Sequence, residues 1–131
     1  MATGRHGRTS DGRLEVDLSV PEEMGGDGGG TNPEQLFAVG YAACFEGALG
    51  TVGRRAKVEL GDASIESKVS LVTTEDRGFT VAVELDVTLP SIEDADEAAQ
   101  LVAAAHQVCP YSNATRGNVE VKLIANGKVV D

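Results

Sequence analysis

The sequence predicts an α+β fold in which antiparallel sheets wrap around central buried helices. Four stretches either alternate between apolar and polar side chains or are rich in strand-forming residues, which is typical of half-buried strands. Two longer stretches, at 33–54 and 92–108, have the composition of helices. Because the strands cluster around these helices instead of alternating with them one by one, α+β is favoured over a parallel α/β sheet.

The first strand is expected at 13–19, where Leu14, Val16 and Leu18 alternate with polar residues. A Gly-rich acidic loop follows at 21–30 and is long enough to be mobile or to wrap a neighbour. No Lys-Ser/Thr pair follows its glycines, so this loop does not match a phosphate-binding loop.

The first helix is expected to begin at Pro33 and to end near Arg54. Thr31 or Asn32 can cap its N-terminus, Pro33 suits the first turn, and the Glu34 carboxylate interacts favourably with the positive end of the helix dipole. Its first half is apolar or small nearly all round, which predicts a buried helix.

The rest of the chain is expected to supply the remaining strands and the second helix. Strands at 63–73 and 78–89 are joined by a polar turn, and the second helix follows at 92–108. A further strand at 119–124 precedes Asn126-Gly127, which is a strong hairpin signal. Because no internal repeat and no linker divides the sequence, residues 1–131 are expected to form a single domain.

The composition limits the partners and the location. The net charge is −10, so nucleic acid and anionic membrane surfaces are unfavourable partners. The basic residues at the N-terminus precede no apolar run, and the longest apolar run, which ends at Glu46, is too short to span a bilayer. We therefore expect a cytoplasmic protein without a secretory signal.

The two cysteines, Cys44 and Cys109, are far apart in sequence and each belongs to its own helical stretch. In a reducing compartment such a pair is more often catalytic or metal-binding than structural, although a buried cysteine taken alone is usually only a small apolar residue. The cysteines could be combined with His6 and His106 into a zinc site, but without a short C-x-x-C spacing this alternative is weak. We expect one thiol to attack a substrate and the other to resolve the product.

A reactive Cys44 needs a cation, because the thiolate is the nucleophile and an apolar setting raises the thiol pKa. Cys44 lies about 11 residues after Pro33, beyond the reach of the positive end of the helix dipole. Arg5 and Arg8, in a Gly-flanked segment before the first strand, are the candidates for this cation. Glu34 is a credible carboxylate to orient a buried arginine.

Two long ungapped blocks now make a resemblance specific. The segments 31–38 with 40–45, and 105–118, resemble the signature blocks of the organic hydroperoxide resistance proteins, a branch of the OsmC-like superfamily. The likeness also includes Asp11-Gly12 and the loop at 20–30, so it extends over nearly the whole chain.

The resemblance implies a thiol peroxidase that uses no haem, flavin or metal, and therefore no cofactor. By the same resemblance, Cys44 matches the peroxidatic cysteine, Cys109 the resolving cysteine, and Glu34 the glutamate that holds an arginine against the thiolate. Gly4 to Gly7 matches the segment that supplies the arginine, which selects Arg5. The interval from Arg5 to the Ser-Asp turn is shorter than in the family and the strand that usually precedes this segment is missing, so Arg8 remains the alternative.

The expected activity is reduction of organic (alkyl or lipid) hydroperoxides to alcohols, through a Cys44 sulfenic acid and a Cys44–Cys109 disulfide that a dithiol reduces. The apolar residues around Cys44, among them Leu36, Phe37 and Phe45, favour such substrates over hydrogen peroxide. The resemblance implies a dihydrolipoyl group on a lipoylated protein as the reductant. Two alternatives stay open: a general OsmC-type peroxidase with a broader oxidant range, and a non-enzymatic thiol redox sensor.

The spacing of Glu34 and Cys44 predicts an assembly. Ten positions of straight helix separate their backbones by about 15 Å and leave them off a common face. Either the helix bends near Gly40, or the glutamate beside each Cys44 comes from a second subunit. The nearly all-apolar helix needs burial on several sides, which favours the second route and predicts an intertwined homodimer with composite sites.

Overall fold

The structure is a computed structural model that describes residues 5–131. Met1–Gly4 lie outside the described residues. They include Gly4, the first residue of the segment that is predicted to supply the arginine. The chain consists of an N-terminal unit, Met1–Phe37, and a C-terminal unit, Ala38–Asp131. Helix α1, Pro33–Ala56, begins in the first unit and continues in the second.

A short antiparallel hairpin opens the N-terminal unit. Strand β1, His6–Arg8, pairs with β2, Glu15–Asp17, so that His6 lies opposite Asp17. The predicted strand at 13–19 is confirmed only in its centre, although the ladder continues to Leu18, whose N–H donates to the Arg5 carbonyl. Strand β1 was not predicted, because three residues that include a glycine are too few to show a period of two.

The Gly-rich loop after β2 is folded on itself. It contains a 3₁₀ turn, η1, Glu22–Met24, and the N–H groups of Met24 and Gly26 both donate to the Pro21 carbonyl. A Cβ atom on Gly26 would collide with the carbonyl oxygen of Val20, so only glycine fits there. The acidic loop is therefore ordered by its own backbone hydrogen bonds.

Asn32 caps the N-terminus of α1. Its Oδ1 accepts a hydrogen bond of 2.9 Å from the backbone N–H of Gln35, while the Thr31 hydroxyl donates to the Gln35 side chain. The helix ends at Ala56, close to the predicted end at Arg54, and both last-turn arginines suit its negative end.

The C-terminal unit is built on a four-stranded sheet of order β3-β4-β5-β6. Its strands are β3, Ser64–Thr73; β4, Phe79–Thr88; β5, Glu120–Ala125; and β6, Lys128–Val130. All neighbours are antiparallel except β4 and β5, whose parallel pairing requires a crossover that the intervening helices supply. The predicted strands and the Asn126-Gly127 turn are confirmed, and both turn residues have the positive φ that such a turn needs.

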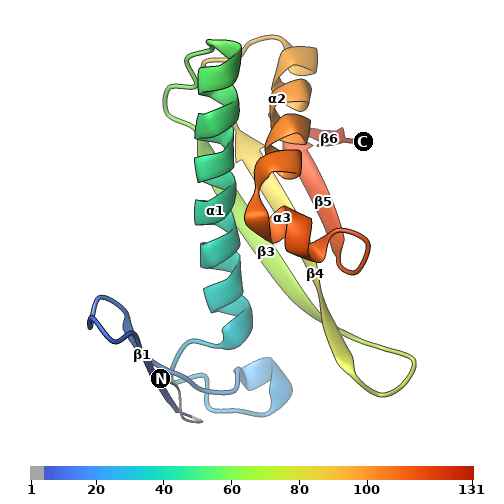
Figure 1. The fold of residues 1–131 in the computed structure, drawn as a ribbon. Helices are drawn as coiled ribbons and strands as arrows, with labels where there is room; N and C mark the ends of the chain where they lie inside the picture. The colour runs from blue at the N-terminus through green and yellow to red at the C-terminus, as the bar shows by residue number, and fades with distance from the viewer. Residues whose placement is uncertain (1–4) are drawn as a thin grey trace. The chain divides into compact units, whose positions relative to one another are not determined.

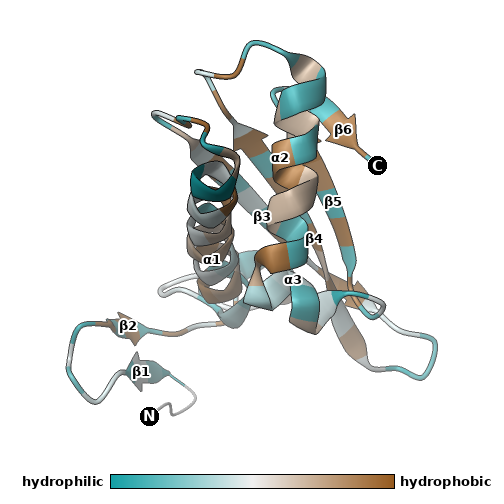
Figure 2. Ribbon diagram, turned by 45° about the horizontal axis from the view of Figure 1, so that its top comes forward, coloured by the Kyte–Doolittle hydropathy of each residue, from teal (hydrophilic) through white to brown (hydrophobic). Residues whose placement is uncertain are grey.

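Two further helices lie between β4 and β5 in the sequence. Helix α2, Ala95–Val108, begins three residues later than predicted, because Asp94 caps it by accepting from the N–H groups of Asp96 and Glu97. Helix α3, Pro110–Thr115, was not among the predicted helices. Helices α1 and α2 lie side by side against the same face of the sheet (Figures 1 and 2).

The core lies between these helices and the sheet. Val83, Leu85 and Val87 alternate along β4 and are buried, as the alternation of apolar and polar residues along the strands in Figure 2 illustrates. The helices contribute Phe45 and Val102, which are fully buried. Burial of such side chains contributes roughly 1.5–3 kcal/mol each to folding.

Within a single chain, helix α1 is buried along one stripe; the burial on further sides that the sequence predicts, by a second subunit, stays a prediction. The stripe recurs at helical spacing and consists of Tyr41, Phe45, Ala48, Leu49, Val52 and Gly53. On another face Val39 is 72% exposed. Among the described residues, α1 is also the helix that is long and apolar enough to cross a membrane, a criterion that core helices of soluble proteins satisfy as well.

Candidate active site

The two cysteines are in contact in the C-terminal unit. The Sγ atoms of Cys44 and Cys109 lie 3.4 Å apart, and both are free thiols. Cys109 is fully buried, whereas Cys44 is partly exposed. A disulfide bond is about 2.05 Å long, so a short movement of the sulfur atoms would join them.

A corner in the backbone places Cys109 beside α1. Pro110 cannot continue α2, and it forces the residue before it into an extended conformation, so Cys109 has φ −62° and ψ 123°. The Cys109 N–H donates to the Ala105 carbonyl, and the Cys109 carbonyl accepts from the Asn113 N–H. Cys109 is therefore held as the C-cap of α2 and the N-cap of α3.

The surroundings of Cys44 do not by themselves activate it. Burial raises the pKa of the Cys44 thiol, and the second thiol so close by raises it further, while a hydrogen bond from the backbone N–H of Tyr111 opposes both effects. An activated nucleophile needs a pKa that is lowered. An activated Cys44 therefore requires a cation that lowers its pKa, the role that the sequence predicts for Arg5 or Arg8.

The predicted cation and its carboxylate belong to the N-terminal unit. Arg5 directly precedes β1, and Glu34 is half-buried in the first turn of α1. Their partnership with Cys44 stays a prediction.

The N-terminal hairpin separates Arg5 from Arg8. Side chains alternate across a strand, so Arg8 shares the face of His6. That face is acidic, since His6 contacts the carboxylates of Glu15 at 3.1 Å and Asp17 at 3.4 Å. Extending the alternation by one residue assigns Arg5 to the opposite face.

That opposite face is apolar. Gly7 lies on it, and a Cβ atom there would meet the side chains of Val16 and Leu18. The two candidate arginines, both exposed, therefore differ in their neighbours: Arg8 shares the acidic face, whereas Arg5 is assigned to the face of Val16 and Leu18.

A buried hydrogen-bond network surrounds the Cys109 corner. Ser112 Oγ lies 2.7 Å from Tyr41 Oη and 2.8 Å from His106 Nδ1. The Arg116 guanidinium donates to the His106 carbonyl at 2.6 Å. Burial and the positive charge of Arg116 lower the pKa of His106, so its imidazole is neutral at pH 7.

The sequence did not reveal the roles of Tyr41 and Ser112. The ring nitrogen of His106, considered in the sequence only as a weak zinc ligand, pairs with the side chain of Ser112. The one available signal was Pro110, because proline is common at the first position of a helix and could have predicted α3. With α3 recognised as a helix, Ser112 could have been predicted on its buried face.

The chain is similar to known proteins over most of its length. Residues 26–124 match the family model described as OsmC-like protein. The chain belongs to the OsmC-like family. It is 53% identical over 124 residues to the organic hydroperoxide resistance protein of Xanthomonas axonopodis pv. citri, a match that covers 92% of this chain and 86% of the relative. It is 49% identical to the organic hydroperoxide resistance protein OhrB of Bacillus subtilis, with 92% of both chains covered.

Solved structures agree with this placement. A putative organic hydroperoxide resistance protein from Vibrio cholerae, with a molecule of captopril bound in one of its active sites, superposes with a TM-score of 0.90 at 50% identity. That match covers 98% of this chain and 90% of the other. The protein from Legionella pneumophila gives a TM-score of 0.88 at 53% identity, covering 94% and 90%. The predicted membership of the organic hydroperoxide resistance branch and the OsmC-like α+β fold are thus confirmed.

The candidate metal ligands are the His, Cys, Asp and Glu side chains in the part of the chain that the structure describes. Among residues 5–131, no group of three or more His, Cys, Asp or Glu side chains is arranged to hold a metal ion. The chemistry that the described residues offer is that of two adjacent thiols.

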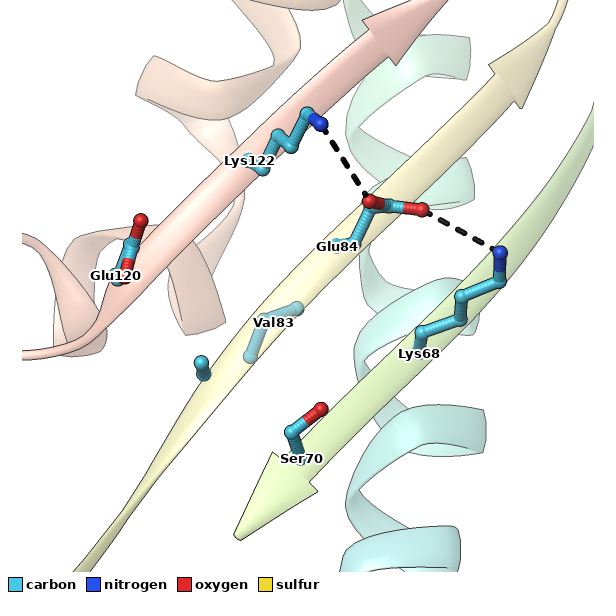
Figure 3. Close-up of a pocket in the computed structure, with 7 residues that line it drawn as sticks. Lys68, Ser70, Val83, Glu84, Glu120 and Lys122 are labelled. Carbon is cyan, nitrogen blue, oxygen red and sulfur yellow. Dashed lines mark ion pairs between the residues drawn. The ribbon is translucent and has the colours of Figure 1, made fainter. Parts of the chain in front are cut away.

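A shallow depression of about 250 Å³ lies elsewhere, on the outer face of the sheet (Figure 3). Glu84 forms ion pairs there with Lys68 at 3.5 Å and Lys122 at 3.9 Å, one from each neighbouring strand. Glu84 alternates with buried Val83 and Leu85, so this depression faces away from the helices and the cysteines. Such exposed pairs stabilise a sheet by roughly 0–1 kcal/mol, and we assign them no chemistry.

Proposed function

We propose that this protein is a cysteine-based peroxidase that reduces organic hydroperoxides, alkyl or lipid, to alcohols. The observation that carries the proposal is the 3.4 Å contact between Cys44 and Cys109, two thiols from different helices in a chain whose relatives are organic hydroperoxide resistance proteins. Residues 1–131 act as one thiol peroxidase domain without a cofactor.

The first step is a nucleophilic attack. The Cys44 thiolate attacks the terminal oxygen of the hydroperoxide, the O–O bond breaks, and the departing alkoxide takes a proton to become an alcohol. Cys44 is left as a sulfenic acid. Its partial exposure admits the substrate, and the Tyr111 N–H stabilises the thiolate.

Arg5 supplies the positive charge that activates Cys44, and Glu34 holds Arg5 in place. The Arg5 guanidinium lowers the pKa of Cys44 and polarises the O–O bond, and the Glu34 carboxylate orients the guanidinium. The apolar face of the N-terminal hairpin supports the choice of Arg5, because Arg8 lies on the face with Glu15 and Asp17.

The second step closes a disulfide. The Cys109 sulfur attacks the Cys44 sulfenic acid, the S–O bond breaks, and the hydroxyl leaves with the Cys109 proton as water. A dithiol then reduces the disulfide by exchange. The family resemblance supports a dihydrolipoyl group on a lipoylated protein as this dithiol, and the Vibrio cholerae relative holds captopril, itself a thiol, in an active site.

The enzyme works as a homodimer with two composite sites in the cytoplasm. Val39, Ala43 and Gly47 recur every four residues on the exposed face of α1, and their small or apolar side chains let a second helix approach closely. Among the described residues, no atom lies within 4 Å of a Cβ built on Gly47. A reducing compartment keeps both thiols free between turnovers.

Repeated turnover tests the proposal. The enzyme is mixed with cumene hydroperoxide and excess dihydrolipoamide, and hydroperoxide loss is compared with that of Cys44→Ser. We expect many equivalents consumed per subunit, little consumption of hydrogen peroxide, and none by the variant. Consumption of one equivalent only would indicate a redox sensor, and equal rates with both peroxides would indicate a general OsmC-type peroxidase.

A further inference from the structure

Ser112 connects the helices that carry the two thiols. Its side chain is fully buried, and its Oγ is hydrogen bonded both to Tyr41 in α1 and to His106 in the last turn of α2. Tyr41 precedes Cys44 by three positions and Ser112 follows Cys109 by three, so each thiol is one helical turn from this junction. One hydroxyl thus joins α1, α2 and α3 beside the sulfur atoms.

The backbone alone does not fix the distance between the thiols. The bonds of Cys109 to Ala105 and Asn113 hold it relative to α2 and α3, but not relative to α1. The hydrogen bond of 2.7 Å between Ser112 and Tyr41 is a direct polar link to α1, shorter than the 3.4 Å contact from Tyr41 to Thr115, and it lies beside the edge-on packing of Tyr111 on Tyr41. Misplacement of reacting groups by about 1 Å can slow a step by as much as 10²-fold.

We propose that Ser112 is a positioning residue for disulfide formation, an inference that rests on the proposed function. By holding the Cys109 corner against α1, it makes Cys109 attack the Cys44 sulfenic acid before a second hydroperoxide molecule oxidises that sulfenic acid. The S–S bond forms as the S–O bond breaks, water leaves, and no outside oxidant or reductant takes part. Without Ser112, the longer-lived sulfenic acid is oxidised to sulfinic acid.

Ser112→Ala separates this role from the first step. The reduced protein receives one equivalent of cumene hydroperoxide, or an excess in a parallel sample, a sulfenic-acid trap is added at successive times, and intact masses give the fractions of sulfenic acid, disulfide and sulfinic acid. We expect sulfenic acid to form at the wild-type rate and disulfide closure to slow on the order of tenfold. In the sample with excess hydroperoxide, which supplies the second oxidising equivalent, we expect sulfinic acid to increase. Tyr41→Phe, which keeps the ring and removes the other end of the bond, should act in the same direction.

Ser67→Ala is the matched control. Ser67 Oγ is buried and has no hydrogen-bond partner among the described residues, so this variant removes the same atom without breaking a bond. It should close the disulfide at the wild-type rate. Circular dichroism at the assay temperature verifies folding, and if Ser112→Ala is unfolded, Tyr41→Phe decides.

Two results would overturn the inference: wild-type closure rates in the folded variants, or an equal loss in Ser67→Ala. A wild-type protein that forms neither sulfenic acid nor disulfide would refute the proposed function instead.

Discussion

The ring of Tyr111 rests on the backbone of α1 at Gly40, one helical turn before Cys44. A Cβ atom on Gly40 would lie 3.4 Å from the Tyr111 hydroxyl oxygen and 3.5 Å from its ring. Tyr111 also packs edge-on against Tyr41, with ring centroids 5.7 Å apart. An aromatic side chain is thereby fixed beside the thiol that its own backbone N–H contacts.

Gly40→Ala should therefore fold normally. A methyl group meets Tyr111 at ordinary contact distance, and replacing glycine within a helix contributes about 0.5–1 kcal/mol to stability. Gly40→Leu should instead displace the Tyr111 ring, cost roughly 1–3 kcal/mol and slow the oxidation of Cys44. Urea unfolding and single-turnover oxidation of both variants measure these effects, and equal oxidation rates would show that the ring position does not matter.

The two cysteines should respond differently to substitution. Cys44→Ser should abolish peroxide reduction, whereas Cys109→Ser should still form a sulfenic acid that becomes overoxidised at high peroxide. The reason is that Cys44 is partly exposed while Cys109 is fully buried. Intact mass after one equivalent of peroxide tests this, and an inert Cys109→Ser would reverse the roles.

Removing the Arg5 guanidinium should raise the pKa of the Cys44 thiol. Burial already raises the pKa of Cys44, and Arg5 is expected to lower it, so in Arg5→Ala alkylation of the thiol should require higher pH. The peroxidase rate should fall by about 10²-fold or more, since polarisation of the O–O bond is lost as well. The pH dependence of iodoacetamide alkylation is the measurement. Arg8→Ala is the control, and a pKa rise confined to it would transfer the role to Arg8.

His106 should make stability depend on pH. Its pKa is lowered by burial and by Arg116, so the unfolded chain takes up the proton first as the pH falls. The stabilisation should be complete above the unfolded histidine pKa of about 6.5 and be lost as the pH falls through the lower folded pKa. Urea unfolding at pH 7.5 and pH 5 should show a smaller loss in His106→Gln than in the wild type. His6→Gln serves as the control for the other histidine.

The composite site can be tested by complementation. Glu34→Ala and Cys44→Ser subunits, each inactive alone, are mixed, unfolded together and refolded. A mixed dimer should regain one good site, because one subunit supplies the glutamate and the other the cysteine. Light scattering reports the dimer. A monomer, or no recovery from the mixture, would place Glu34 and Cys44 in the same chain.

The sequence determined most of the elements through local rules. Two strand-like stretches joined by a polar turn predicted β3 and β4, alternation predicted β5, cap chemistry predicted the start of α1, and Asn-Gly predicted the last turn. Local rules missed β1 and α3, which are too short to show a period. They also do not say which faces of the apolar helix α1 have a partner within the chain, and there only one stripe is buried.

The tertiary structure decided which groups meet. The sequence singled out Cys44 and Cys109 as chemically notable, but their 3.4 Å contact depends on the Pro110 corner and on the packing of α3 against α1. The Ser112 junction was equally invisible, since a serine after a proline reads as a turn until its partners 71 positions away in α1 and 6 away in α2 are known. Residue types carry the chemistry, whereas distances between distant residues arise only when helices pack and the chain closes on itself.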